Sequence, residues 1–195
     1  MGPGVYSIVA GLCFLLNFVL YVRMISGVTR SEKRDIYVGI MIIGIIYLGL
    51  DVLWGAIYDS LIPIPIAVQE LIYAAYYASS AILSYRWFAY VEYMQESVLY
   101  HNSKIRLLTK LPMMFVVVVA VLSIWTHSFF YIDTQGTYCR GPLYEAQLVF
   151  TYGYILFAAG KLLIQLLTTK DFQTQNTYLI MLSYFVFPVV FGVLQ

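Results

Sequence analysis

Two acidic residues of this chain lie inside apolar segments, where a charge is costly. Asp51 lies in "LGLDVLWG" and Glu70 in "PIAVQELIY". Ionisable groups within membrane-spanning helices are rare and mark ligand sites, ion pathways or contacts between helices. We expect each of these carboxylates either to contact a ligand or to form hydrogen bonds between helices.

Aromatic residues accompany these acids along the chain, together with a few further polar groups. Aromatic walls supply contact area in a binding pocket, and a few polar groups fix the orientation of the ligand. Acids outnumber bases in this region, which favours a cationic ligand or one rich in hydrogen-bond donors. The alternative is that the rings act only as anchors at the membrane interface, where Tyr and Trp are enriched. The predicted ligand-binding residues are Asp51, Trp54, Glu70, Tyr73, Tyr77, Arg140, Tyr144 and Gln147.

The sequence offers no recognisable set of catalytic residues. It has no zinc-binding His-Glu pattern, no Ser-His-Asp set and no nucleotide-binding loop, and its 2 histidines, His101 and His127, fall on opposite sides of the predicted membrane. We therefore predict no catalytic residue, no metal and no cofactor within these residues. A net charge of +1 gives no indication of a nucleic acid partner.

The elements that must position these side chains are membrane helices. The chain has 195 residues, of which 62% are hydrophobic and only 11% are charged, and its mean hydropathy is +0.81. Soluble domains have about 25% charged residues, whereas a helix of about 20 apolar residues crosses a bilayer. We predict an all-α integral membrane fold that forms a single sensor domain over 1–195, with six transmembrane helices of an expected seven and a short extracellular β-hairpin-like loop between the fourth and fifth. The predicted helices cover about 4–25, 36–57, 64–93, 107–126, 143–168 and 177–195.

Basic residues set the predicted orientation. All of the 11 Lys and Arg residues except Arg140 fall in or beside the first, third and fifth loops. The positive-inside rule places those loops in the cytoplasm, so the amino terminus and the loop around Arg140 lie outside. We expect a multi-pass protein of a bacterial plasma membrane, with a seventh span after Gln195.

Arg86 and Lys161 lie towards the cytoplasmic ends of their predicted helices. Long basic side chains can extend along apolar surface and place their charge among the headgroups. The alternative is an ion pair with Glu92 or with a group on another helix.

The external loop "FFYIDTQGTYCRGPLYE" has the composition of a hairpin. Short extended pieces flank "TQGT", and Gly136 supplies a backbone position that tolerates a positive φ. Arg140 is the one external cation of the predicted topology. It pairs with a nearby acid or meets an anionic group of a ligand.

This loop also resembles a known family. The run "F-x-I-D-x-x-G-x-Y-x-R-G-P-L-Y", carried here by residues 130–144, is similar to the external loop in the amino-terminal seven-helix sensory regions of bacterial histidine kinases and GGDEF diguanylate cyclases. "LDVLWG" and "YRWFAYVEY" are similar to the cyclase-linked branch. The resemblance implies a detached sensory module whose last helix and output domain are absent from this sequence.

The leading hypothesis is therefore a receptor. An extracellular or membrane-borne small ligand would shift the helices, and a homodimer would relay the shift to a cytoplasmic cyclase or kinase. An alternative is the substrate-binding subunit of an energy-coupling-factor transporter, although such subunits keep both termini in the cytoplasm. A further alternative is a scaffold whose polar residues only hold helices together.

Overall fold

The computed structural model is an all-helical bundle with one small hairpin, and it describes residues 5–27, 29–59, 61–133 and 136–182. Among these described residues, helices α1, α2, α3, α5 and α6 are the 5 segments that are long and apolar enough to cross a membrane. Residues 172–182 are also helical. The elements are α1 (Val5–Gly27), α2 (Glu32–Tyr58), α3 (Ile66–Met94), α4 (Val98–His101), α5 (Ser103–Thr126), β1 (Phe130–Ile132), β2 (Tyr138–Arg140) and α6 (Tyr144–Thr168).

The first five predicted spans are confirmed as helices. Their bounds agree with the structure to about one helical turn, the largest difference being that α2 and α5 begin earlier than predicted. The sixth span was predicted over 177–195. Its first residues are helical up to 182, and 183–195 lie outside the described residues.

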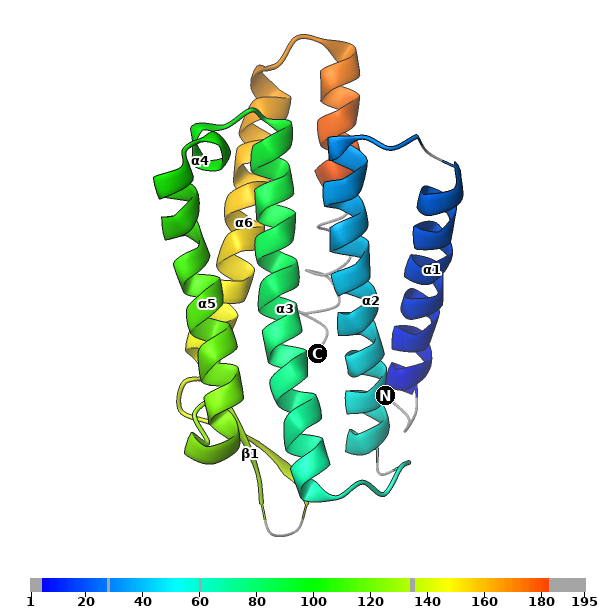
Figure 1. The fold of residues 1–195 in the computed structure, drawn as a ribbon, viewed down its shortest axis with the longest axis vertical. Helices are drawn as coiled ribbons and strands as arrows, with labels where there is room; N and C mark the ends of the chain where they lie inside the picture. Colours follow the sequence, from blue (N-terminus) through cyan, green and yellow to red (C-terminus); the bar gives the residue numbers. More distant parts are fainter. Residues whose placement is uncertain (1–4, 28, 60, 134–135, 183–195) are drawn as a thin grey trace.

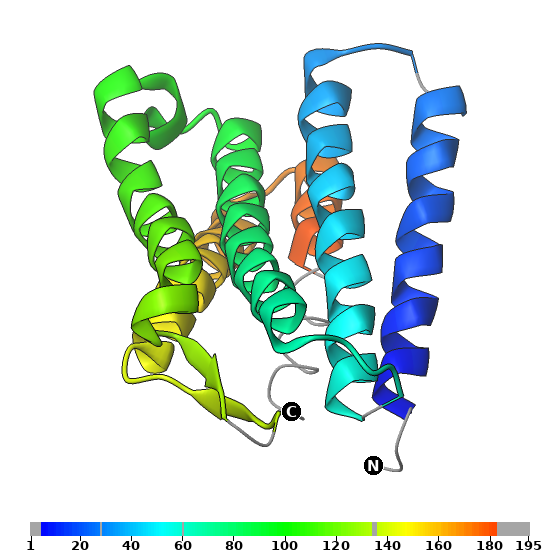
Figure 2. The same ribbon diagram turned by 60° about the horizontal axis from the view of Figure 1, so that its bottom comes forward.

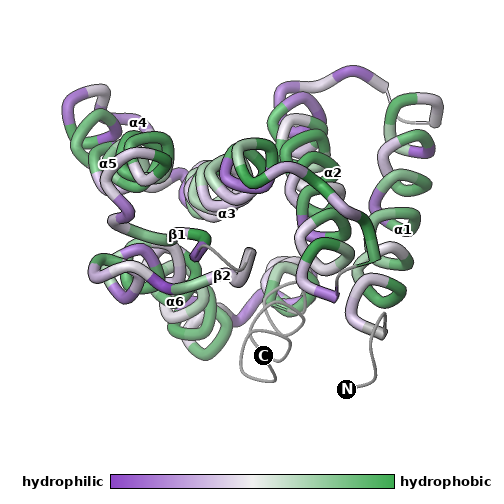
Figure 3. Tube along the Cα trace, turned by 90° about the horizontal axis from the view of Figure 1, so that it is seen from below, coloured by the Kyte–Doolittle hydropathy of each residue, from purple (hydrophilic) through white to green (hydrophobic). Residues whose placement is uncertain are grey.

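Helix α3 occupies the centre of the bundle. It packs against α2, α5 and α6, whereas α1 lies at the edge and packs against α2 (Figure 1). Most residues of α1 are apolar (Figure 3). Many of them face outward, and Leu12 and Leu16 are each 62% exposed. Such a surface is compatible with lipid as the surrounding solvent, because an apolar side chain loses nothing when it faces hydrocarbon.

The loops gather at opposite ends of the bundle. The start of α1, the connection from α2 to α3 and the hairpin lie at one end, which we call the hairpin end (Figure 2). The connection from α1 to α2, helix α4 and the connection after α6 lie at the other end, which we call the basic end (Figure 1). The first, third and fifth loops, in or beside which all Lys and Arg residues except Arg140 fall, thus lie at one end of the fold.

A buried ion pair joins α3 to α6 towards the basic end. The ammonium of Lys161 lies 2.7 Å from each carboxylate oxygen of Glu92 and 3.4 Å from the Ser97 hydroxyl. The side chain of Glu92 is 1% exposed and that of Lys161 is 27% exposed. The ion-pair alternative is therefore confirmed for Lys161, whereas Arg86 is exposed.

A second link between helices lies at the proline of α5. Pro112 has no backbone N–H, and proline usually disturbs the helical hydrogen bonds around it. The hydroxyl of Tyr154, from α6, accepts a hydrogen bond from the Met113 N–H at 3.1 Å and donates one to the Thr109 carbonyl at 2.6 Å. Since Met113 and Thr109 are i and i−4 partners of one helical turn, a side chain of α6 completes the backbone of α5.

Candidate functional site

The predicted hairpin is present. Strands β1 and β2 pair antiparallel, with Phe130 opposite Arg140 and Ile132 opposite Tyr138. At the turn, the Asp133 side chain accepts a hydrogen bond from the Thr137 N–H at 2.8 Å, and Gly136 has a φ of 81°. A positive φ is a conformation that glycine adopts without steric cost, as predicted for Gly136. Residues 134–135, within the predicted "TQGT" turn, lie outside the described residues.

The base of the hairpin is fixed to the end of α5. Phe129 is fully buried, and its N–H donates a hydrogen bond to the Ser123 hydroxyl at 3.0 Å. The N–H of Gly141 donates to the Phe129 carbonyl at 2.9 Å. A Cβ at position 141 would collide with the carbonyl oxygens of His127 and Ser128, so only glycine fits this approach of two backbone segments.

Aromatic rings from the hairpin and the helices form one continuous group at the hairpin end. We call it the aromatic cluster. Tyr138 of β2 lies at its centre, with ring centroids 5.3 Å from Tyr73 and 6.2 Å from Trp54. The members are Trp54, Tyr73, Tyr76, Tyr77, Phe130, Tyr138 and Tyr144.

Hydroxyl groups add polar contacts inside the aromatic cluster. The hydroxyls of Tyr77 and Tyr138 share a hydrogen bond that joins α3 to β2. Burial raises the pKa of the Tyr138 phenol, so it is neutral at neutral pH and remains able to donate. The hairpin is thus held to the helices by both ring contacts and a buried hydrogen bond.

Arg140 lies at the border of the aromatic cluster. Its guanidinium carbon is 4.6 Å from the centre of the Tyr144 ring, which is the geometry of a cation–π contact. Arg140 forms no ion pair with an acid in the part of the chain that the structure describes. Its side chain is exposed, which leaves its N–H groups available to an anionic partner.

Asp51 is buried at the border between α1 and α2. Its carboxylate accepts a hydrogen bond from the Tyr6 hydroxyl at 2.6 Å, and the Tyr76 hydroxyl is a second polar neighbour. Tyr6 also meets the edge of the Trp54 ring, with centroids 5.7 Å apart. Asp51 therefore forms an interhelical hydrogen bond and is connected to the aromatic cluster through Tyr76.

The remaining predicted residues lie apart from Asp51. Glu70 is half-buried in the first turns of α3 and has no hydrogen bond or ion pair with any described residue. Gln147 is buried, and its amide nitrogen donates to the Thr151 hydroxyl at 3.2 Å. Its side-chain oxygen has no partner among the described residues.

The structure thus unites most of the predicted site and adds residues to it. Trp54, Tyr73, Tyr77 and Tyr144 belong to the aromatic cluster, and Asp51 and Arg140 adjoin it. Tyr138 and Tyr6 were not among the predicted site residues. The signal for Tyr138 was its place in the hairpin strand beside Arg140. The signal for Tyr6 was weaker. It is a lone phenol near the start of α1, and that end of the bundle also holds Asp51.

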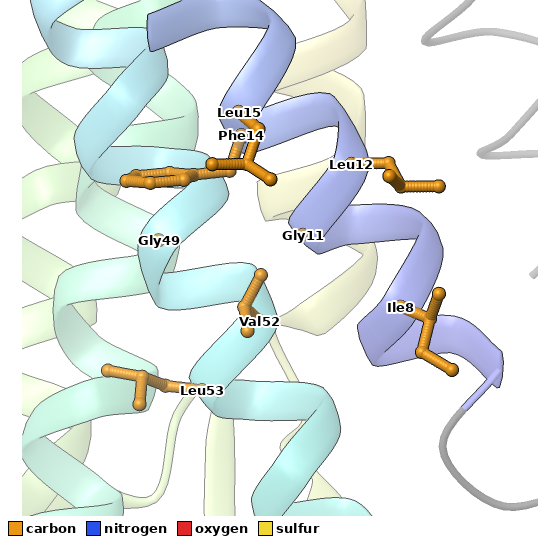
Figure 4. A pocket seen from close by; sticks show the side chains of 8 residues that line it. All are labelled: Ile8, Gly11, Leu12, Phe14, Leu15, Gly49, Val52 and Leu53. Carbon is orange, nitrogen blue, oxygen red and sulfur yellow. The ribbon is translucent and has the colours of Figure 1, made fainter.

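Two hollows of the described surface lie away from the aromatic cluster. One, of about 510 Å³, is an apolar groove between α1 and α2, into which Phe14 projects towards Gly49 (Figure 4). Another, of about 420 Å³, lies at the basic end between α2, α3 and the helical residues 172–182. At the aromatic cluster the rings of the hairpin and the helices contact one another.

No family model, curated protein or solved structure matches this chain. The described residues hold no group of three or more His, Cys, Asp or Glu side chains arranged to bind a metal ion. The aromatic cluster and its border combine the buried Asp51 carboxylate, phenol hydroxyls, ring faces and the Arg140 guanidinium. These groups can bind and orient a ligand.

Proposed function

We propose that this chain is a membrane receptor module that senses a small ligand at its hairpin end. The observation that carries this proposal is the position of Tyr138, whose ring and hydroxyl join the hairpin to α2 and α3. A ligand that separates these contacts changes the packing of two membrane helices at once. The hairpin then acts as the element that converts binding into helix movement.

The ligand class follows from the groups that line the aromatic cluster. A carboxylate and several electron-rich ring faces favour an amine or another donor-rich cation, since cations are attracted to aromatic faces. Such a ligand reaches Asp51 by replacing the hydrogen bond from Tyr6 and entering between the rings. It shifts the helices only by the difference between its affinities for the closed and the opened arrangement.

The proposed orientation places the hairpin end outside a bacterial plasma membrane and the basic end in the cytoplasm. It rests on the shared position of the Lys- and Arg-rich loops. A homodimer would relay the movement of α3 and α6 to an output unit. The resemblance of the hairpin sequence to the sensory regions of kinases and cyclases supports a diguanylate cyclase or a histidine kinase as that output.

The test is a thermal-stability screen of the detergent-purified protein against small amines and other metabolites. A ligand that binds only the folded state raises the unfolding temperature by mass action. We expect the stabilisation by such a ligand to disappear in Asp51→Asn. Glu145→Gln is the matched control, because it removes an exposed acid at the same end of the bundle that is not one of the predicted ligand-binding residues. An equal loss in both variants would place the binding site away from Asp51.

A second measurement separates a receptor from a scaffold. The chain has 2 cysteines, and Cys139 lies on β2 beside Tyr138. In a Cys13→Ser background, a fluorophore on Cys139 reports the surroundings of the hairpin. A receptor changes this fluorescence when the ligand binds, whereas a scaffold does not. Accumulation of radiolabelled ligand by cells that produce the protein would instead favour the transport subunit.

A further inference from the structure

A groove at the basic end combines positive charge with aromatic and apolar walls. It has a volume of about 420 Å³ and lies between the connection from α1 to α2, helix α3 and the helical residues 172–182. Its size falls in the range of about 300–1,000 Å³ that is usual for small-molecule sites. It lies at the opposite end of the bundle from the aromatic cluster, so it is independent of the proposed receptor site.

One wall carries the first turn of α2 and its basic side chains. Ser31 caps this helix, since its hydroxyl accepts a hydrogen bond from the Arg34 N–H at 3.2 Å. Lys33 and Arg34 both line the groove. The N-terminus of a long helix also carries partial positive charge, which adds to the charge of these side chains.

Arg34 has a structural role, whereas Lys33 is free to bind. The Arg34 guanidinium donates hydrogen bonds to the carbonyls of Met24 and Ile25, at 3.3 Å and 3.1 Å, and thereby fixes the end of α1 to α2. The ammonium of Lys33 is exposed and makes no hydrogen bond or ion pair with any described residue. The groove therefore presents a fixed guanidinium and an unengaged ammonium.

The two acids in the first turn of α2 already have partners. Asp35 pairs with Arg30 at 3.2 Å and with Arg34 at 3.3 Å, and Glu32 interacts with the Tyr93 hydroxyl. Neither acid lines the groove. Asp35 thus offsets the charge of Arg34, and the net positive charge of the lining comes from Lys33.

The opposite wall is aromatic and apolar. Trp87 and Tyr90 of α3 lie with ring centroids 5.6 Å apart, and Ile180 and Met181 face the groove from the helical residues 172–182. Trp and Tyr side chains favour the headgroup level of a bilayer, because their rings are amphipathic. The wall thus continues from the charged rim towards the apolar interior of the membrane.

We propose that this groove binds an anionic phospholipid. Lys33 and the N-terminus of α2 receive the phosphodiester, and an acyl chain lies along Trp87 and Ile180. A lipid fits better than a soluble phosphate, because most of the remaining lining is apolar. A small anion would leave this apolar surface in contact with water, whereas an acyl chain would cover it. A zwitterionic headgroup brings its own cation next to Lys33 and is therefore disfavoured.

The test uses Trp87 as the probe. The chain has 3 tryptophans, so the double substitution Trp54→Phe and Trp125→Phe leaves Trp87 as the only one. In bilayers of phosphatidylcholine, brominated lipids quench this fluorescence when they lie beside the ring. We expect brominated phosphatidylglycerol to be preferred over brominated phosphatidylcholine, and Lys33→Gln to reduce that preference about fivefold, the effect of one basic residue near a membrane surface.

The control is Lys104→Gln, which removes the same charge from the basic end at an exposed position outside the groove. It should leave the preference unchanged. Equal quenching by both lipids, or an equal loss in both variants, would overturn the proposal. Displacement of the lipid by millimolar glycerol 3-phosphate would also overturn it, because the site would then select a soluble phosphate. Thermal stabilisation of the unsubstituted protein by phosphatidylglycerol provides a second measurement that does not depend on the tryptophan substitutions.

Discussion

Substitution of Lys161 should show how much the stability of the bundle depends on its buried ion pair. The substitution Lys161→Met keeps the length of the side chain and deletes the ammonium that contacts both oxygens of Glu92 at 2.7 Å. The carboxylate of Glu92 is then left buried without its partner. Removing one member of a buried ion pair typically costs about 3–5 kcal/mol in free energy of unfolding.

The two members of the pair differ in exposure, so their substitutions should differ in cost. Glu92 is 1% exposed and cannot reach water, whereas the Lys161 side chain is 27% exposed and also has the Ser97 hydroxyl at 3.4 Å. Glu92→Met should therefore be milder than Lys161→Met. The double variant with Met at both positions removes both charges, and apolar replacement of a whole pair is often neutral or stabilising.

Thermal unfolding in detergent, followed by circular dichroism, measures these differences. At about 2–4 °C for each kcal/mol in a chain of this size, Lys161→Met should lower the unfolding temperature by roughly 6–20 °C. Lys170→Met, an exposed basic residue just beyond α6, is the matched control and should shift it little. The reasoning is refuted if Lys161→Met behaves like that control, or if the double variant is as unstable as the single one.

Other substitutions test further contacts. Gly141→Ala should detach the base of the hairpin, because the added Cβ collides with two carbonyls, and should lower the free energy of unfolding by about 2 kcal/mol or more. Gly153→Ala, at an open helical position, should instead stabilise the protein in the same unfolding assay. Tyr154→Phe removes two hydrogen bonds to the α5 backbone and should lower the free energy of unfolding by about 1–3 kcal/mol. Hydrogen bonds from Thr174 lower the pKa of the exposed Asp171 carboxyl in the folded protein. The ionised carboxylate therefore stabilises the following helix fully at a pH above the ordinary Asp pKa of about 4. This stabilisation is lost as the pH falls through the lower pKa of the folded state. Hydrogen exchange over residues 172–182 at decreasing pH checks this, and Asp171→Asn should weaken the pH dependence.

Helix positions and the hairpin could be predicted from the sequence because their causes are local. Continuous apolar runs specify membrane helices without reference to the rest of the chain, and the described part of each run is helical. The hairpin follows from "TQGT" and Gly136, whose positive φ is a property of the turn itself. The grouping of the basic loops at one end follows from the alternation of antiparallel spans.

The partners within the site could not be predicted in the same way. Asp51 and Glu70 have the same chemistry and occupy similar surroundings in the sequence, yet Asp51 bonds to Tyr6 and Glu70 bonds to no described residue. The difference arises from the rotation of each helix about its axis. A helix that is apolar on every face has no sequence pattern from which that rotation could be predicted. The closeness of the rings in the aromatic cluster depends on the seating of Tyr138 between α2 and α3, which is a property of tertiary packing.

The hydroxyl of Tyr154 has a consequence for the mechanics of the bundle. Because it bonds to both the Met113 N–H and the Thr109 carbonyl, the turn of α5 that contains Pro112 is held by an atom of the neighbouring helix. A peptide of α5 alone, or a chimera with α6 from another protein, would lack these two hydrogen bonds. Rotation of α6 about its axis would withdraw the hydroxyl and leave the Met113 N–H and the Thr109 carbonyl without this partner. The hydrogen bonding of α5 at this turn therefore depends on how α6 is rotated about its own axis.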